Sequence, residues 1–163
     1  AKGMTENEAV EAADRAVQKP GYSEHNTGLA MDFNTVNDSF KDTNTYAWLM
    51  EHAEDYGFVL RYPEDKEDIT GIMYEPWHFR YVGIPHSMFM MEKHLCLEEY
   101  IEDIKNYSIH KPLNYYFQNR LFSIFYVPIL NQTATITLAD NAVYQISGNN
   151  IDGFIVTVWR TYA

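Results

Sequence analysis

Residues 23–34 read Ser-Glu-His-Asn-Thr-Gly-Leu-Ala-Met-Asp-Phe-Asn, and the second half of this stretch has the pattern of a β-strand. Apolar side chains occupy every second position there: Leu29, Met31 and Phe33. Alternation of apolar with small or polar residues is typical of a strand that has one face in a core. We therefore predict a strand whose apolar face points inward, with Asp32 on the opposite face.

The same stretch carries two residues that could hold a metal ion. A neutral imidazole, as in His25, and a carboxylate, as in Asp32, are good ligands for zinc. Gly28 lies between them and permits a tight turn. The chain could therefore bring the two side chains to one point.

Residues 75–78, Glu-Pro-Trp-His, supply a further carboxylate and a further imidazole. A catalytic zinc site has three protein ligands, leaves the fourth position to water, and needs a carboxylate that can accept a proton from that water. The two segments together contain this set: His25, Asp32, His78 and Glu75. Spacing alone is a weak indication, because a lone histidine is usually an ordinary surface or core residue. We give that interpretation to the other four histidines: His52, His86, His94 and His110.

Helices are expected on both sides of the first segment. Residues 5–8, Thr-Glu-Asn-Glu, form a capping-box pattern, so a helix should follow and end before Pro20. A second helix is expected from Asn44 to Tyr56, with Gly57 as its stop. Its inner stripe should consist of Ala47, Leu49, Met50 and Ala53.

Short strands and a helical region are expected around the second segment. The strands are predicted near residues 58–61, 72–74 and 79–82. From residue 85 to residue 106 the pattern is helical, first rich in Met and then acidic. The first two thirds of the chain therefore combine helices with a small sheet.

Beyond residue 106 charge becomes sparse and short alternating runs take over. Residues 133–138 and 154–159 have the period-two pattern of strands, and residues 148–153 supply turn chemistry between them. We predict an α+β protein with two parts: a metal-binding core at 1–106 and a small β-rich C-terminal subdomain at 107–163.

The charge, the apolar runs and the cysteine content of the chain exclude or disfavour several kinds of protein. The chain has 163 residues and a formal net charge of -11. Nucleic-acid affinity depends mainly on Lys and Arg neutralising phosphates, so a nucleic-acid partner is disfavoured. No run of about 18 apolar residues is present that could span a bilayer. The single cysteine, Cys96, excludes an intramolecular disulfide and a multi-thiolate zinc site, and its apolar neighbours indicate an inert, buried thiol.

A resemblance to a known family covers roughly residues 5–103. The motif S-x-H-x-x-G-x-A-x-D at 23–32, followed by E-P-W-H at 75–78, is similar to the paired signature of VanY-type D-alanyl-D-alanine carboxypeptidases. These enzymes are relatives of the dipeptidases of vancomycin resistance. Four further stretches match in order: 56–63, 69–72, 80–83 and 97–100. The resemblance implies a D,D-peptidase or hedgehog-like metallopeptidase core, in which helices flank a small antiparallel sheet.

The resemblance also implies a role for individual residues. His25, Asp32 and His78 would bind Zn²⁺, and Glu75 would be the general base and later the general acid. Ser23 would help to hold the substrate, and Trp77 would restrict the pocket or simply pack beside it. The implied substrate is a peptidoglycan stem peptide ending in D-Ala-D-Ala, from which the last D-Ala is removed.

One part of the family pattern does not occur in this sequence. Family members carry a Ser-Gly-Tyr-Arg-like segment upstream of the first motif, and its arginine assists the substrate carbonyl or the developing oxyanion. No such segment precedes Thr5. Arg61 and Arg80 match strand positions of the family, so we expect them to be structural. We expect the missing piece to lie before Ala1, and this chain to bind zinc but to be weak or inactive as a peptidase.

Two other functions stay open from the sequence. Related metallopeptidases cut other peptidoglycan bonds, such as L-Ala-D-Glu, and the shared motifs do not choose the bond. A non-catalytic cell-wall-binding or sensory module is the second alternative, although such a module has no need of Glu75. Because peptidoglycan lies outside the cytoplasmic membrane, we expect an extracytoplasmic location in the bacterial cell envelope. A cytoplasmic location is the other possibility, because some relatives act on cytoplasmic precursors.

Overall fold

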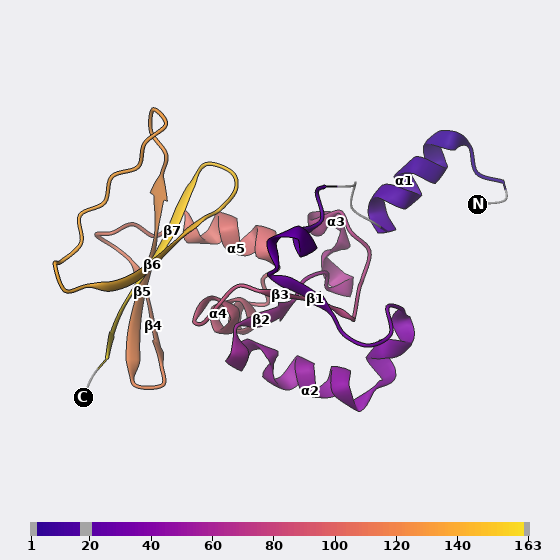
Figure 1. Ribbon diagram of the computed structural model, residues 1–163, viewed down its shortest axis with the longest axis horizontal. Helices are drawn as coiled ribbons and strands as arrows, with labels where there is room; N and C mark the ends of the chain where they lie inside the picture. The colour runs from indigo at the N-terminus through magenta and orange to yellow at the C-terminus, as the bar shows by residue number, and fades with distance from the viewer. Residues whose placement is uncertain (1–2, 17–20, 162–163) are drawn as a thin grey trace. The chain divides into compact units, whose positions relative to one another are not determined.

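The computed structural model describes residues 3–16 and 21–161, which form two compact units with their boundary between Glu98 and Glu99. The first contains short strands and most of the helices, and the second contains a larger sheet (Figure 1). The α+β class is therefore confirmed. The division into domains at 1–106 and 107–163 stays a prediction, because compactness alone does not define a functional domain.

Three short antiparallel strands form the sheet of the first unit. They are β1 (Ala30–Asp32), β2 (Phe58–Leu60) and β3 (His78–Tyr81), in the order β1-β3-β2. In the register of β1 with β3, Asp32 lies directly opposite His78. The central strand thus brings the two sequence motifs side by side.

The first unit also contains α-helices and short turns of 3-10 helix. The α-helices of the first unit are α1 (Glu6–Ala16), α2 (Asn44–His52), α3 (Glu67–Thr70) and α4 (His86–Lys93). Single turns of 3-10 helix are η1 (Glu24–Thr27), η2 (Asp38–Asp42), η3 (Ala53–Tyr56) and η4 (Glu64–Lys66). The capping box of α1 is confirmed, since Thr5 N donates to Glu8 Oε2 at 2.7 Å. Gly57 ends η3 at a φ of 86°, as its position predicts.

A cluster of buried apolar residues joins α2 to the sheet. Its buried members are Phe40, Leu49, Ala53 and Phe79, of which the two phenylalanines are fully buried. Burying a side chain of this size stabilises the fold by about 1.5–3 kcal/mol. Trp77 packs against the cluster from the turn that precedes β3. The core therefore supports the strand that carries His78.

Several predicted elements differ in the structure. Leu29 and Met31 are 41% and 42% exposed, so the apolar face predicted for β1 is wrong; only Phe33 packs into the core, against Phe40 and Phe79. Residues 72–74 form no strand, because they find no backbone partner in a sheet. Ala47 is exposed instead of facing the core.

The region predicted to be helical from 85 to 106 is two helices. The chain leaves α4 at His94, whose φ of 53° is left-handed, and resumes as α5 (Leu97–Ile104). Cys96 lies between the two helices and is buried, as predicted. The predicted end of the first helix before Pro20 falls on residues 17–20, outside the described residues.

The second unit is built on a four-stranded antiparallel sheet. Its strands are β4 (Leu113–Phe117), β5 (Arg120–Pro128), β6 (Val143–Gly148) and β7 (Gly153–Thr161), in the order β4-β5-β7-β6. Ile124 and Val156 are buried in its two central strands. The strand predicted at 133–138 is absent from the described structure, where this stretch pairs with no strand. The predicted turn between β6 and β7 is present, and Asn149 Oδ1 accepts three backbone N–H groups there.

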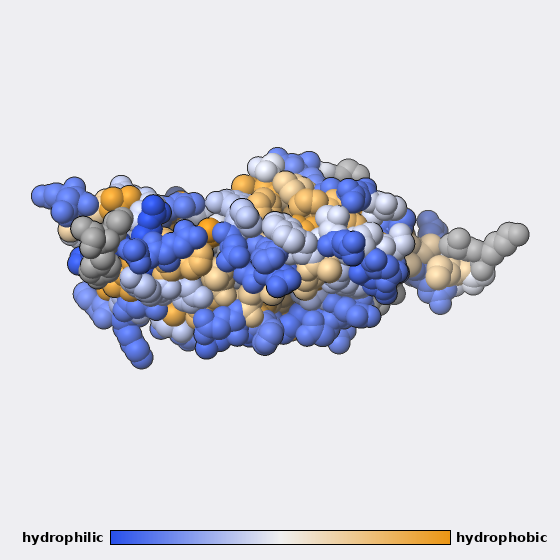
Figure 2. Space-filling view, turned by 90° about the horizontal axis from the view of Figure 1, so that it is seen from below, coloured by the Kyte–Doolittle hydropathy of each residue, from blue (hydrophilic) through white to orange (hydrophobic). Residues whose placement is uncertain are grey.

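The surface agrees with an acidic, polar chain. The face in Figure 2 is largely hydrophilic, with smaller hydrophobic areas between. Among residues 3–16 and 21–161, no helix has the length and apolar character needed to cross a membrane.

Candidate metal site

His25 is placed by a single helical turn with a cap at each end. Ser23 is the N-cap of η1, and its hydroxyl accepts the N–H of His25 at 3.3 Å. Gly28 ends the turn with a φ of 71° and donates its N–H to the carbonyl of His25 at 3.0 Å. A left-handed φ suits glycine because it has no Cβ. The spacing between the first two candidate ligands is thus set by this capped turn and the start of β1.

His78 and Asp32 are placed by the sheet. Directly opposed residues of an antiparallel pair hold their Cβ atoms about 4.5–5.5 Å apart on one face. His78 also ends a tight turn, in which its N–H donates to the carbonyl of Glu75 at 3.1 Å. Pro76, at the second position of that turn, is fully buried and suits the backbone angle required there. The turn therefore keeps Glu75 beside His78.

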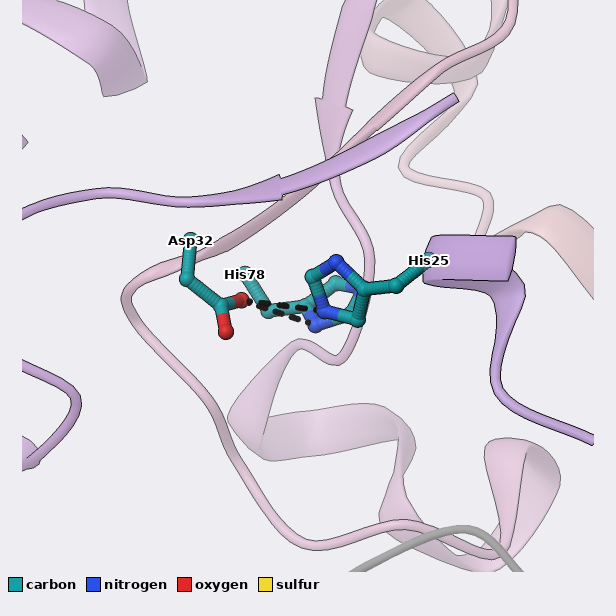
Figure 3. A group of neighbouring side chains, drawn as sticks. All are labelled: His25, Asp32 and His78. Carbon is teal, nitrogen blue, oxygen red and sulfur yellow. Dashed lines mark ion pairs between the residues drawn. The ribbon is translucent and has the colours of Figure 1, made fainter. Parts of the chain in front are cut away.

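The three candidate ligands converge on one point (Figure 3). Asp32 Oδ1 lies 3.4 Å from His25 Nε2 and 3.2 Å from His78 Nδ1. The three atoms all lie within 4.8 Å of one another. Two ligands that are each about 2.0–2.1 Å from a tetrahedral zinc ion lie about 3.3–3.4 Å apart. The donor set and its spacing thus fit zinc.

Glu75 lies next to this point. Its Oε2 is 3.4 Å from His78 Nδ1, and its side chain is only 12% exposed. Burial raises the pKa of Glu75 to about 7; nearby His78 lowers this pKa, while the carboxylates of Asp32 and Glu24 raise it. A carboxyl group with a pKa near neutrality can both accept and return a proton.

A cavity of about 240 Å³ opens beside the candidate ligands. Both residues predicted to bind substrate line it, Ser23 and Trp77, together with Tyr62, Val36 and Ile72. Ser23 also caps η1, and Trp77 also packs on the core, so each has a structural contact as well. Burial raises the pKa of Tyr62 to about 12, which keeps this wall of the cavity uncharged.

One residue of the site was missed by the sequence reasoning. Glu24 Oε1 lies 2.8 Å from His78 Nε2, on the side of the ring away from the candidate ligands. Its Oε2 accepts from Arg61 Nε and Arg80 Nη1, both at 3.1 Å. Both arginines predicted to be structural are thus engaged by a carboxylate. The sequence contains one signal for this cluster: Arg80 follows His78 by two residues in β3, so the two share a face.

Comparisons with known proteins find similar carboxypeptidases and dipeptidases. The family model of VanY, D-alanyl-D-alanine carboxypeptidase, matches residues 2–84. A D-alanyl-D-alanine carboxypeptidase of Enterococcus faecium is 48% identical over 139 residues, which cover 85% of this chain and 45% of that protein. Because 139 residues exceed the first unit, the similarity extends into the β-rich part, beyond the resemblance drawn from the motifs.

Two solved structures are similar in fold as well. One is the vancomycin-resistance D,D-dipeptidase VanXYg in complex with a D-Ala-D-Ala phosphinate analog, which is 42% identical with a TM-score of 0.82. The match covers 93% of this chain and 68% of the VanXYg chain. The other is a variant of the D,D-pentapeptidase VanY from a VanB-type resistance cassette, in complex with Zn(II). It is 47% identical with a TM-score of 0.54, and the match covers 61% of this chain and 56% of the VanY chain. The chain spans less than half the length of the curated Enterococcus faecium relative.

Proposed function

Because the chain belongs to the VanY family of D-alanyl-D-alanine carboxypeptidases, we propose that it takes part in zinc-dependent removal of the terminal D-Ala from peptidoglycan stem peptides. The observation that carries this proposal is the convergence of His25, Asp32 and His78 beside Glu75. A binding module would need the first three residues but not the fourth. The buried carboxylate therefore favours hydrolysis over simple recognition.

The candidate ligands suit zinc by chemistry and by spacing. His25 Nε2, Asp32 Oδ1 and His78 Nδ1 would hold the ion, as the Zn(II)-bound relative supports. When bound, zinc supplies a Lewis acid that polarises the scissile carbonyl and lowers the pKa of a water molecule to near 7. A set of three protein ligands leaves room for that water and for the substrate.

Glu75 would move the proton in the reaction. Its carboxylate accepts a proton as the water oxygen attacks the carbonyl carbon of the scissile amide. The same proton then passes to the amide nitrogen as the C–N bond breaks, so that free D-Ala leaves as an amine. The position of Glu75 beside His78, and its raised pKa, support both steps.

The cavity supports a small substrate group. Its volume of about 240 Å³ is below the roughly 300–1,000 Å³ that is usual for ligand sites. Val36, Ile72 and Trp77 offer apolar contacts that suit a methyl side chain. We propose that the C-terminal end of the stem peptide binds there, with Ser23 at the edge nearest to the ligands.

The proposed substrate also implies a place and a biological role. Peptidoglycan lies outside the cytoplasmic membrane, so we propose an extracytoplasmic site of action in the bacterial cell envelope. Removal of the terminal D-Ala alters the D-Ala-D-Ala end of the precursor. The vancomycin-resistance names of the similar structures support a link to antibiotic resistance.

The test is release of free D-Ala from a stem pentapeptide by the zinc-loaded protein. We expect slow release of D-Ala that disappears in Glu75→Ala, because a general base contributes about 10²–10⁴-fold to the rate. Zinc affinity should stay within a few-fold, since Glu75 is not one of the proposed ligands.

Two results would contradict the proposal. Release that continues unchanged in Glu75→Ala would exclude the proposed proton transfer. Cleavage of the L-Ala-D-Glu bond, with the D-Ala-D-Ala end left intact, would instead identify an endopeptidase of the same superfamily.

A further inference from the structure

Glu24 is a buried carboxylate to which the proposed reaction gives no task. Its side chain is only 14% exposed, although it is charged and lies next to His25 in the sequence. Burying an ionised carboxylate is costly unless it is paired and hydrogen-bonded. The contacts of Glu24 therefore indicate what the residue does.

The two oxygens of Glu24 have separate partners. Oε2 accepts hydrogen bonds from the guanidinium groups of Arg61 and Arg80, both at 3.1 Å. Oε1 faces His78 Nε2 at 2.8 Å. The arginines thus hold one oxygen, and the imidazole ring takes the other.

The hydrogen bonds around Glu24 suit an ionised carboxylate. Two guanidinium groups, those of Arg61 and Arg80, donate to the same oxygen, Oε2, and hydrogen bonds between charged groups of opposite sign favour the charged form of each. Glu98 pairs with the other side of Arg61, at 2.6 Å and 3.0 Å. Two carboxylates thus face two guanidinium groups, and the formal charges of this cluster cancel.

An ionised carboxylate can only accept a hydrogen bond. His78 Nε2 must then carry a proton, and in the neutral imidazole Nδ1 presents its lone pair. Nδ1 is the atom that faces Asp32 Oδ1 at 3.2 Å and Glu75 Oε2 at 3.4 Å. The hydrogen bond to Glu24 therefore selects the ring nitrogen that can bind a metal ion.

We propose that Glu24 is the positioning residue of the metal site, fixing both the tautomer and the orientation of His78 while Arg61 and Arg80 anchor Glu24 itself. This inference rests on the proposed zinc site and adds a residue to it. Glu24 is one of the residues that line the cavity, but its two carboxylate oxygens face His78, Arg61 and Arg80, so its role in the metal site is exerted through His78.

The first test compares Glu24→Gln with Glu98→Gln. Both replace a carboxylate on Arg61 by an amide of the same shape, but only Glu24 contacts His78. An amide can turn either its oxygen or its NH₂ to the ring, so the selection of the tautomer is lost. We expect zinc affinity, measured by competition with a chelating indicator, to fall about 10–100-fold in Glu24→Gln. In Glu98→Gln it should stay within about twofold of the wild type.

A third variant, Glu24→Asp, separates charge from position. Aspartate keeps the negative charge for the arginines but is shorter by one methylene, so it reaches His78 less well. Zinc affinity should stay low in this variant if position matters, and should return to the wild-type value if charge alone matters. The return would overturn the proposal, as would equal affinities of wild type, Glu24→Gln and Glu98→Gln.

A measurement on the wild-type protein covers the case in which the variants do not fold. Nitrogen-15 NMR of the zinc-loaded protein should show His78 with a proton on Nε2 and with Nδ1 coordinated. A proton on Nδ1 with Nε2 coordinated would overturn the role of Glu24 but leave the zinc site intact. Failure of the wild type to bind zinc would instead overturn the proposed function, and this inference with it.

Discussion

The two units hold their sheets together in different ways. In the first unit the strands are three or four residues long. The polar side chain of His78, in β3, is buried there against the carboxylate of Glu24. In the second unit β5 and β7 are nine residues each, pair along their full length and bury apolar residues. Long pairing and an apolar core are enough to build a sheet. The first unit has a short sheet instead, and capped turns and ion pairs place the reactive side chains around it.

We expect metal binding to depend on the first unit alone, because all three proposed ligands lie in it. We expect His25→Ala to cause the largest effect, a loss of zinc affinity beyond the roughly 100-fold seen when a residue that orients a ligand is replaced. The reason is that His25 provides one of three proposed ligand atoms. Competition with a chelating indicator measures the change.

The matched control is His110→Ala in the second unit. His110 is exposed and precedes β4, so its removal should leave zinc affinity unchanged. Equal losses in the two variants would show that zinc binds at general surface histidines and would contradict the site.

A core substitution in either unit should lower the stability of the fold. Phe79→Ala should lower the free energy of unfolding by about 3–5 kcal/mol, and Ile124→Ala by about 2–5 kcal/mol, because both side chains are fully buried. Urea unfolding of the metal-free variants, with tryptophan fluorescence and circular dichroism, measures both changes.

The two core variants should differ in metal binding. Phe79 follows His78 in β3, so its loss should also weaken zinc binding, whereas Ile124→Ala should leave it unchanged. Weaker zinc binding in Ile124→Ala together with unchanged zinc binding in Phe79→Ala would contradict the dependence of the metal site on the first unit.

The smallest expected effect concerns the turn that carries His25. Gly28 has a φ of 71°, and a Cβ there would meet no atom within 4 Å. Gly28→Ala should therefore destabilise only through the backbone, by about 1–2 kcal/mol. Thermal unfolding measures it, and Gly28→Asn should recover part of the loss because Asn tolerates this conformation.

Gly148 in β6 offers the control for Gly28. A Cβ at Gly148 would also meet no atom within 4 Å, but its φ is not left-handed. Gly148→Ala should therefore cost nothing or slightly stabilise the sheet. A larger loss at Gly148 than at Gly28 would contradict the backbone explanation.

The site residues stay a prediction, but the sequence indicated which side chains the fold brings together better than it indicated the strands around them. The residues proposed as ligands and base were identified from two short motifs, and the structure brings them together. The reason is that local turns and one strand register determine their positions. Glu24 was missed because its partners lie 37 and 56 residues away, and such contacts exist only after folding.

The failed strand predictions have a common physical cause. Residues 72–74 and 133–138 have apolar and alternating patterns, but a strand also needs a neighbour with which its backbone can pair. In β1 the alternation was correct as a strand signal but wrong as a burial signal, since Met31 is exposed. A pattern of side chains therefore indicates neither the backbone partner that a strand needs nor the face of the strand that becomes covered.

The most direct test of the proposed metal site is X-ray absorption at the zinc edge, together with the zinc content of the purified protein. We predict one zinc ion per chain, bound by two imidazoles and by oxygen donors, with Zn–N distances of about 2.0–2.1 Å. In His25→Ala the same measurement should show one imidazole ligand instead of two, because His25 is one of the proposed ligands. A thiolate ligand at about 2.3 Å, which would have to be the single cysteine, Cys96, would contradict the proposed site, as would a site with a single imidazole.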